Sequence, residues 1–143
     1  MIFILYFLLI SFTKPQDLPA DKGCSIIVEI TNLKSTQADV LVGVFEKNGF
    51  PRRDSVKYNA VKTPNAKTIT VEVPNIPPGE YAVTAFQDMN GDLYLNKTIF
   101  GAPKEPFGFS HNPTIRFSEP AFEECAFKIT DQDKRVQVRM NIW

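Results

Sequence analysis

Apolar and polar residues alternate along most of this 143-residue chain, and that period of two is the feature that most constrains its fold. In the last segment, Val136, Val138, Met140 and Ile142 alternate with polar residues. Such alternation is typical of a β-strand with one buried face, because successive side chains of a strand point to opposite sides. Beyond the first residues, no apolar pattern of helical period persists over several turns. The sequence therefore predicts an all-β protein.

Segments of the same kind recur between Gly, Pro, Asn and Asp residues, which favour turns. The expected strands cover residues 24–31, 40–45, 69–73, 81–86, 114–117, 122–129 and 135–142, with a weak edge strand at 56–61. About seven short strands with regularly spaced turns are typical of two packed sheets. We therefore predict a single antiparallel β-sandwich, in which the continuous apolar run at 40–45 is covered on both faces.

The size and charge of the chain limit what it can be. A chain of roughly 150 residues can bury a sizeable core, so residues 21–143 are predicted to form one domain. Lys and Arg together number 16, as do Asp and Glu, and the formal net charge is +0. Because no basic field exists, we do not expect the chain to bind nucleic acid.

Residues 1–12 form an almost continuous apolar run, and a polar, turn-rich segment follows it. A membrane-spanning helix needs about 20 apolar residues, so the run is too short to span a bilayer. Its length and position are typical of a secretory signal peptide, although no basic residue precedes it. We predict that residues 1–20 are a signal peptide and linker and that the mature protein is secreted or periplasmic. A buried first strand or a short anchor is the alternative.

The chain has two cysteines, Cys24 and Cys125, whose wide separation fits neither a metal motif nor a redox motif. In an oxidising compartment, a disulfide that closes a loop of about 100 residues would stabilise the fold by up to about 4.7 kcal/mol. Both residues fall on the apolar side of their expected strands. We predict a disulfide bond between them, with two buried free thiols as the alternative.

A long loop, Asp88–Asn112, interrupts the strands, and we expect it to be ordered because it carries aromatic residues and spaced glycines. Its first part places oxygen-bearing side chains at alternate positions: Asp88, Asn90, Asp92, Tyr94 and Asn96. Ca²⁺ takes 6–8 oxygen ligands, so this spacing suggests a calcium site. The Gly and Glu of an EF-hand loop are missing, however, and Asp and Asn residues also cap turns by bonding their own backbone.

The second part of the loop supplies a candidate binding surface: Glu105, Phe107, Phe109, Ser110 and His111. Exposed loop aromatics can form a platform for a sugar ring or a peptide, whereas buried ones would simply fold back over the sandwich. Asp88 and Glu105 could form a glycosidase pair if their separation suited one. Ser110 and His111 are neighbours without the sequence context of a catalytic serine, so we predict no catalytic residue.

Three motifs carry a family resemblance: P-P-G-E-Y-A-V at 77–83, F-Q-D-M-N-G-D at 86–92 and G-A-P-K-E-P-F-G-F-S at 101–110. They resemble an uncharacterised, mostly secreted bacterial family that is known as a domain of unknown function. The resemblance covers the chain after the leader and implies an exported sandwich akin to immunoglobulin- or prealbumin-like modules. It implies no known reaction. Leu93 and Asn96 stand where that family usually has Gly and Asp, which removes a flexible turn residue and a negative ligand.

These observations leave three hypotheses for the function. The first is a secreted, non-enzymatic binding module whose 88–112 loop forms the binding surface, with Ca²⁺ as the only cofactor considered. The second is a small carbohydrate-active hydrolase that uses loop carboxylates. The third is a structural accessory domain of the cell envelope. The partner under the first hypothesis would be a glycan, a peptide or an envelope protein.

Overall fold

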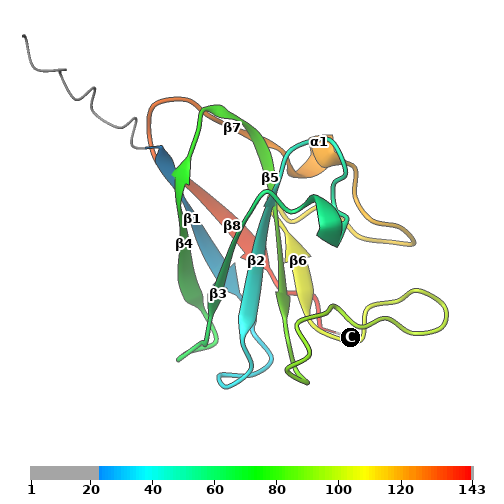
Figure 1. Ribbon diagram of the computed structural model, residues 1–143. Helices are drawn as coiled ribbons and strands as arrows, with labels where there is room; N and C mark the ends of the chain where they lie inside the picture. The colour runs from blue at the N-terminus through cyan, green and yellow to red at the C-terminus, as the bar shows by residue number, and fades with distance from the viewer. Residues whose placement is uncertain (1–22, 143) are drawn as a thin grey trace, which may run out of the picture.

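The computed structural model describes residues 23–142 and shows two β-sheets packed face to face (Figure 1). One sheet has the strand order β4-β1-β8, and the other has the order β3-β2-β5-β6, with β7 also paired to β5. The strands are β1 (Cys24–Thr31), β2 (Val40–Phe45), β3 (Tyr58–Lys62), β4 (Ile69–Ile76), β5 (Gly79–Gln87), β6 (Phe107–Phe109), β7 (Phe127–Ile129) and β8 (Lys134–Arg139). The predicted β-sandwich is confirmed.

The main core lies between the two sheets and is made by the apolar residues of the alternating strands. On β1, for example, Ile26, Val28 and Ile30 are all 0% exposed, whereas Glu29 between them is exposed. The inward residues of β2, β4, β5 and β8 meet them to form one continuous cluster. The strand period thus places one apolar set between the sheets, as the sequence predicted.

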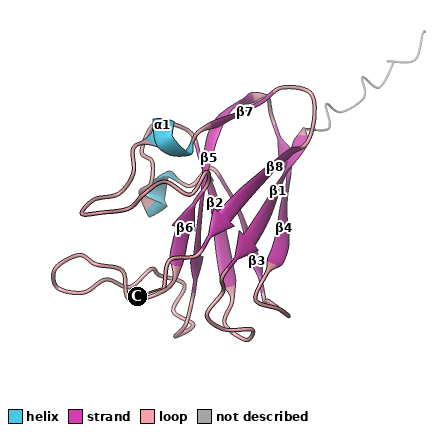
Figure 2. Ribbon diagram, turned by 180° about the vertical axis from the view of Figure 1, so that it is seen from behind, coloured by secondary structure: helices cyan, strands magenta, loops and turns pink. Residues whose placement is uncertain are grey.

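The structure departs from the expected strands in three places; Figure 2 shows the elements concerned, α1, β6, β7 and β8, from behind. The β8 strand runs parallel to β1, so one pair in the sandwich is not antiparallel. Residues 114–117 form no strand, and residues 122–129 divide into a short helix, α1 (Phe122–Cys125), and β7. Finally, the last part of the long loop contains β6, so the irregular segment that follows β5 ends at residue 106.

A second, smaller apolar cluster covers part of the outer face of the β3-β2-β5-β6 sheet. Phe45 projects from β2 on this face, and the ring of Phe50 lies 5.6 Å from its ring. Phe50 comes from the segment that also carries the short 3₁₀ helix η1 (Arg53–Ser55) and packs against Phe109 and Phe122 as well. The β2 strand is therefore covered on both faces, as its continuous apolar run predicted.

The predicted disulfide is wrong, because both cysteines are free. Cys24 packs at the edge of the main core, whereas Cys125 belongs to the second cluster on the other side of the β5 sheet. The error came from assigning Cys125 to a strand: it lies in α1, and the bend of that helix takes the thiol away from the space between the sheets. Burial raises the pKa of the Cys125 thiol to about 12, which keeps it protonated and unreactive.

The predicted signal peptide and linker, residues 1–20, lie outside the described residues. Within residues 23–142, no helix is long and apolar enough to cross a membrane.

Candidate functional site

Asp88 follows β5 directly and organises the loop after it. Its side chain is only 3% exposed. Oδ1 accepts hydrogen bonds from the backbone N–H groups of Gly91 (2.9 Å) and Asp92 (3.2 Å), and Oδ2 accepts one from Leu93 (2.8 Å). The carboxylate thus holds a turn in which Gly91 and Leu93 adopt positive φ values of 75° and 64°. Both of its oxygens serve the backbone.

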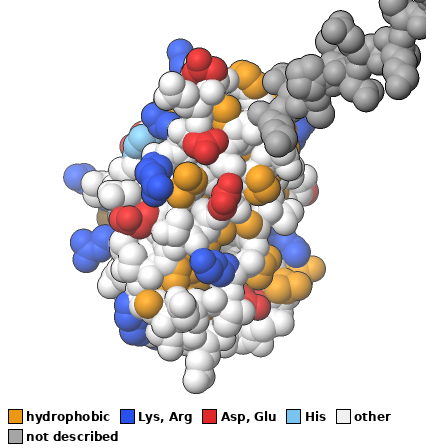
Figure 3. All heavy atoms as spheres, turned by 90° about the vertical axis from the view of Figure 1, so that its left-hand side faces the viewer, with side chains coloured by type: hydrophobic (Ala, Val, Ile, Leu, Met, Phe, Trp, Pro, Cys, Tyr) orange, Lys and Arg blue, Asp and Glu red, His pale blue; other side chains and the backbone are white. Residues whose placement is uncertain are grey.

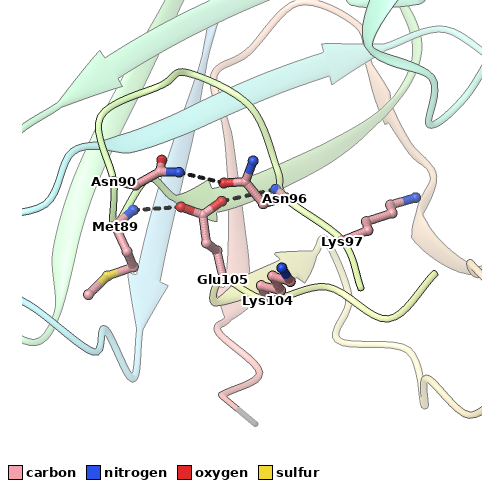
Figure 4. A pocket seen from close by; sticks show the side chains of 6 residues that line it. All are labelled: Met89, Asn90, Asn96, Lys97, Lys104 and Glu105. Carbon is pink, nitrogen blue, oxygen red and sulfur yellow. Dashed lines mark hydrogen bonds between the residues drawn. The ribbon is translucent and has the colours of Figure 1, made fainter. Parts of the chain in front are cut away.

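Glu105 closes the same loop from its other end (Figure 4). Its carboxylate is 5% exposed, and it accepts the N–H of Met89 at 2.8 Å and the N–H of Asn96 at 3.1 Å. In Figure 4 the carboxylate lies between these two backbone segments, and the side chain of Lys97 points away from it. Glu105 therefore ties the start of the loop to residue 96.

Asn90, Asp92 and Asn96 bring their side chains together at the exposed side of the loop. The Nδ2 atoms of Asn90 and Asn96 donate to Asp92 Oδ2 at 3.1 and 2.8 Å, and Asn90 Nδ2 also donates to Asn96 Oδ1 at 2.9 Å. The bond from Asn96 and the backbone N–H of Tyr94 lower the pKa of the Asp92 carboxyl. Three of the five predicted calcium ligands therefore lie together.

The structure divides the five predicted calcium ligands. Asn90, Asp92 and Asn96 lie together, whereas the Asp88 carboxylate is occupied by backbone donors and the Tyr94 ring lies against Arg53. Within residues 23–142, no group of three His, Cys, Asp or Glu residues could hold a metal ion. A cation here would depend on one carboxylate and two amide oxygens, so calcium binding stays a prediction.

In the second half of the loop, the phenylalanines fold back over the sandwich, which is the alternative to an exposed aromatic platform. Glu105, Phe107, Phe109 and Ser110 are 5%, 5%, 7% and 0% exposed, and only His111 is exposed. The reason is that Phe107 and Phe109 belong to β6, whose outward side chains enter the second apolar cluster. His111 stands at a positive φ of 66°, with its ring 6.2 Å from that of Phe127.

Gly108 and Ser110 explain the rest of the F-G-F-S motif structurally. A Cβ atom on Gly108 would lie 2.6 Å from the carbonyl oxygen of Arg139, so β6 can approach β8 only with glycine at this position. The Ser110 Oγ accepts the N–H of Val83 at 2.9 Å and donates to the carbonyl of Cys125 at 2.7 Å. Ser110 therefore joins β5, β6 and α1, and this bonding occupies the hydroxyl that a nucleophile would need.

The geometry also gives no support to the predicted hydrolase alternative. A general acid or base must reach a proton on the substrate. Asp88 and Glu105 are both almost fully buried and bonded to backbone N–H groups within the loop. The two carboxylates are therefore placed to shape the loop rather than to meet a sugar.

A groove with a volume of about 710 Å³ lies on the outer face of the β3-β2-β5-β6 sheet. Strand register places Val61, Leu41, Phe86 and Phe107 in one row across this sheet, because Leu41 is opposite both Val61 and Phe86, and Phe86 is opposite Phe107. The neighbouring row contains Asn59, Gly43 and Thr84, and the Phe45 ring lies close above Gly43. The row from Val61 to Phe107 makes that part of the floor apolar.

Two loops form the walls of the groove. The segment after β2 contributes Pro51, Arg52 and Val56, and the loop after β5 contributes Leu93, Tyr94 and Leu95. The two walls meet where the guanidinium carbon of Arg53 lies 3.7 Å from the centre of the Tyr94 ring. Such a cation–π contact is worth about 0.5–1 kcal/mol at an exposed site. The framework built by Asp88 and Glu105 thus carries one wall of the groove.

The lining of the groove contains more basic than acidic side chains. Its lining contains Arg52, Arg53 and Lys97 but only one acidic residue, Glu119. Lys97 Nζ lies 3.3 Å from Glu119 Oε1, and Arg52 Nε lies 3.8 Å from Asp54 Oδ1 outside the lining. On the face that Figure 3 shows, by contrast, acidic and basic side chains are interspersed. Because Lys97 and Arg52 are paired, Arg53 is the lining cation that remains, among residues 23–142, to meet a negative group of a ligand.

Sequence reasoning missed the residues that shape this groove. Leu41, Phe86 and Val61 were recognised only as strand residues, because without the strand order their common row cannot be known. Gln87 was missed as well: its fully buried amide bonds the backbone of Lys34, Ser35 and Ala38 and anchors the loop before β2. A buried glutamine next to Asp88 could have been suspected only from its position in an apolar strand.

The fold and the groove define a small β-sandwich with a shaped outer face. A family model described as "uncharacterized protein conserved in bacteria (DUF2141)" matches residues 28–137. The chain belongs to this family, whose function is unknown, and the resemblance seen in the sequence is confirmed. No curated protein and no solved structure matches the chain.

Proposed function

We propose that the protein is a secreted, non-catalytic binding module that holds an apolar ligand in the groove on the outer face of the β3-β2-β5-β6 sheet. The observation that carries the proposal is the groove itself. Its volume of about 710 Å³ falls within the roughly 300–1,000 Å³ of small-molecule sites, which are also mostly apolar. Secretion rests on the predicted leader, which mass analysis of the exported chain would test.

The nature of the floor favours a hydrocarbon-like ligand over a peptide. The strands beneath the groove pair with one another, so the sheet offers side chains rather than free backbone groups. A peptide would bring N–H and C=O groups that find few partners on an apolar surface, and burying them unpaired is costly. An acyl chain carries no such groups, and Arg53 at the rim would suit a carboxylate at its end.

Binding of Nile red, an uncharged apolar fluorophore, tests the proposal. Leu41→Thr removes apolar surface from the middle of the floor and should weaken binding several-fold. Ile27→Thr is the matched control, because Ile27 is also half-buried and outward-facing, on the central strand of the other sheet. Equal binding by the two variants, or no binding by the native protein, would refute the groove as a binding site.

Calcium binding by the loop is a separate part of the proposal. It is supported by the convergence of Asn90, Asp92 and Asn96 at the exposed side of the loop. A bound cation would hold the loop that forms one wall of the groove and so act structurally.

A further inference from the structure

Two loops on one side of the molecule expose large apolar side chains. Ile99 and Phe100 stand at the tip of a turn closed by the bridge between Lys97 and Pro103, and they are 94% and 92% exposed. Phe117, on the loop between β6 and α1, is 102% exposed. Both loops extend away from the sheets on the same side, at the right of Figure 1 and the left of Figure 2. We propose that these two tips insert into the surface of an anionic lipid membrane.

The exposure of these side chains calls for an explanation, because they add nothing to the core. Single apolar residues scattered over a surface are ordinary, whereas exposed apolar residues that gather in one region mark interaction sites. Ile99, Phe100 and Phe117 lie almost wholly in solvent, on the same side of the molecule. The Lys97–Glu119 pair, at 3.3 Å, links the two loops near their bases and keeps the tips on one side. Two apolar loop tips held on one side in this way can enter the same lipid bilayer together.

The backbone of the first tip is prepared for such an environment. Thr98 donates its N–H to the carbonyl of Ala102 at 2.7 Å, and Gly101 donates to the carbonyl of Thr98 at 2.9 Å. The N–H of Ala102 bonds the Thr98 hydroxyl at 3.2 Å. Backbone groups that enter an apolar layer unpaired are costly, so internal bonding lowers the cost of inserting this turn.

The charges beside the tips match an anionic lipid surface. Lys104 follows the first tip, and Arg116 directly precedes Phe117. Within residues 23–142, neither cation forms an ion pair, so both are available to lipid headgroups. Aromatic residues flanked by Lys and Arg are typical of the interface between membrane and water. A protein partner is less favoured, because two narrow tips do not provide the roughly 800 Å² per partner of a specific interface.

Co-sedimentation of the purified protein with vesicles tests the inference, and this assay does not depend on export of the chain. We expect binding to vesicles of phosphatidylcholine with phosphatidylglycerol and at least about tenfold weaker binding for Phe100→Ser or Phe117→Ser, as the loss of an aromatic side chain from an apolar phase predicts. Both side chains are exposed, so these variants should fold normally. Ile27→Thr, which changes a half-buried apolar residue on the outer face of the other sheet and lies outside the groove, is the control and should bind like the native protein.

Two further measurements separate the alternatives. Lys104→Gln with Arg116→Gln should abolish the preference for vesicles that contain phosphatidylglycerol over pure phosphatidylcholine. Phe100→Trp, in a Trp143→Phe background that removes the only native tryptophan, should show blue-shifted emission and quenching by brominated lipids. Equal binding of the native chain and the Phe100 and Phe117 variants would overturn the inference. Dimerisation lost in those variants, without vesicle binding, would overturn it in favour of a second copy.

Discussion

Replacing Asp88 by Asn is the sharpest test of how the loop is held. The carboxylate is 3% exposed and accepts the backbone N–H groups of Gly91, Asp92 and Leu93. An Asn side chain has the same shape but only one acceptor oxygen. Whichever way the amide is placed, its NH₂ group faces at least one backbone N–H, so two donors oppose each other. The remaining bonds also lose the charge that strengthens them.

The size of the effect follows from these contacts. A hydrogen bond to a charged group contributes about 1.5–3 kcal/mol, and a buried group left without its partner costs about 1–3 kcal/mol. We therefore expect Asp88→Asn to lower the free energy of unfolding by about 3 kcal/mol. With an m-value of roughly 1–3 kcal/mol/M, the urea midpoint should fall by about 1–3 M.

The matched control is Asp92→Asn, four residues further along the same loop. Asp92 also accepts a backbone N–H, that of Tyr94 at 2.8 Å, but its side chain is exposed. Water can replace its bonds, so the loss of stability should be much smaller. If urea denaturation gave the same midpoint for both variants, burial of the Asp88 carboxylate would not be what holds the loop.

Three other outcomes are expected. Leu93→Gly should stabilise the protein by up to about 1 kcal/mol in thermal or urea unfolding, because the φ of 64° is costly for leucine and easy for glycine; a destabilised variant would contradict this. Because burial raises the pKa of Cys125 from 9.0 to about 12, its contribution to stability is present below pH 9 and is lost as the pH rises from 9 to 12. The unfolding free energy of Cys125→Ala should therefore fall less over that range than that of the native protein or of the control Cys24→Ala. Calcium should raise the melting temperature of the native protein but not of Asp92→Asn, and a melt that is the same in calcium and in chelator would remove the metal.

Much of the fold could be predicted because burial imposes a period of two wherever one face of a strand meets the core. On β1, the apolar residues Ile26, Val28 and Ile30 are the buried ones, so the pattern in the sequence matches the burial in the structure. Strand order is a different matter. The parallel pairing of β8 with β1 joins the two ends of the domain, and nothing in either local pattern specifies it.

The segment around Cys125 shows where a period of two misleads. Four residues of this segment are buried: Phe122, Cys125, Phe127 and Ile129. A single strand would bury such a set, and so would a short helix that is followed by a strand. A helix of one turn is too short to produce a helical period. The prediction of a disulfide depended on that assignment, and it failed together with it.

The sequence pointed to the loop after β5, and its role as a functional site stays a prediction. The structure shows that Asp88 and Glu105 shape this loop. Their roles could not be read from the chain, because a carboxylate spaced for a metal and one that caps a turn have the same sequence. The cation–π contact of Arg53 with Tyr94 joins segments far apart in sequence and could not be predicted either.

The loop framework and the groove should be coupled, and this coupling can be measured. Asp88 does not line the groove, but the loop that it holds carries Tyr94 and Leu95, which do. If Asp88→Asn loosens that loop, the wall must be ordered again when a ligand binds, and the affinity falls by the cost of that ordering. We therefore expect Asp88→Asn to weaken Nile red binding several-fold under conditions in which the variant is still folded. Asp92→Asn should leave it nearly unchanged, and undiminished binding by Asp88→Asn would mean that the sheet alone, without the loop, forms the site.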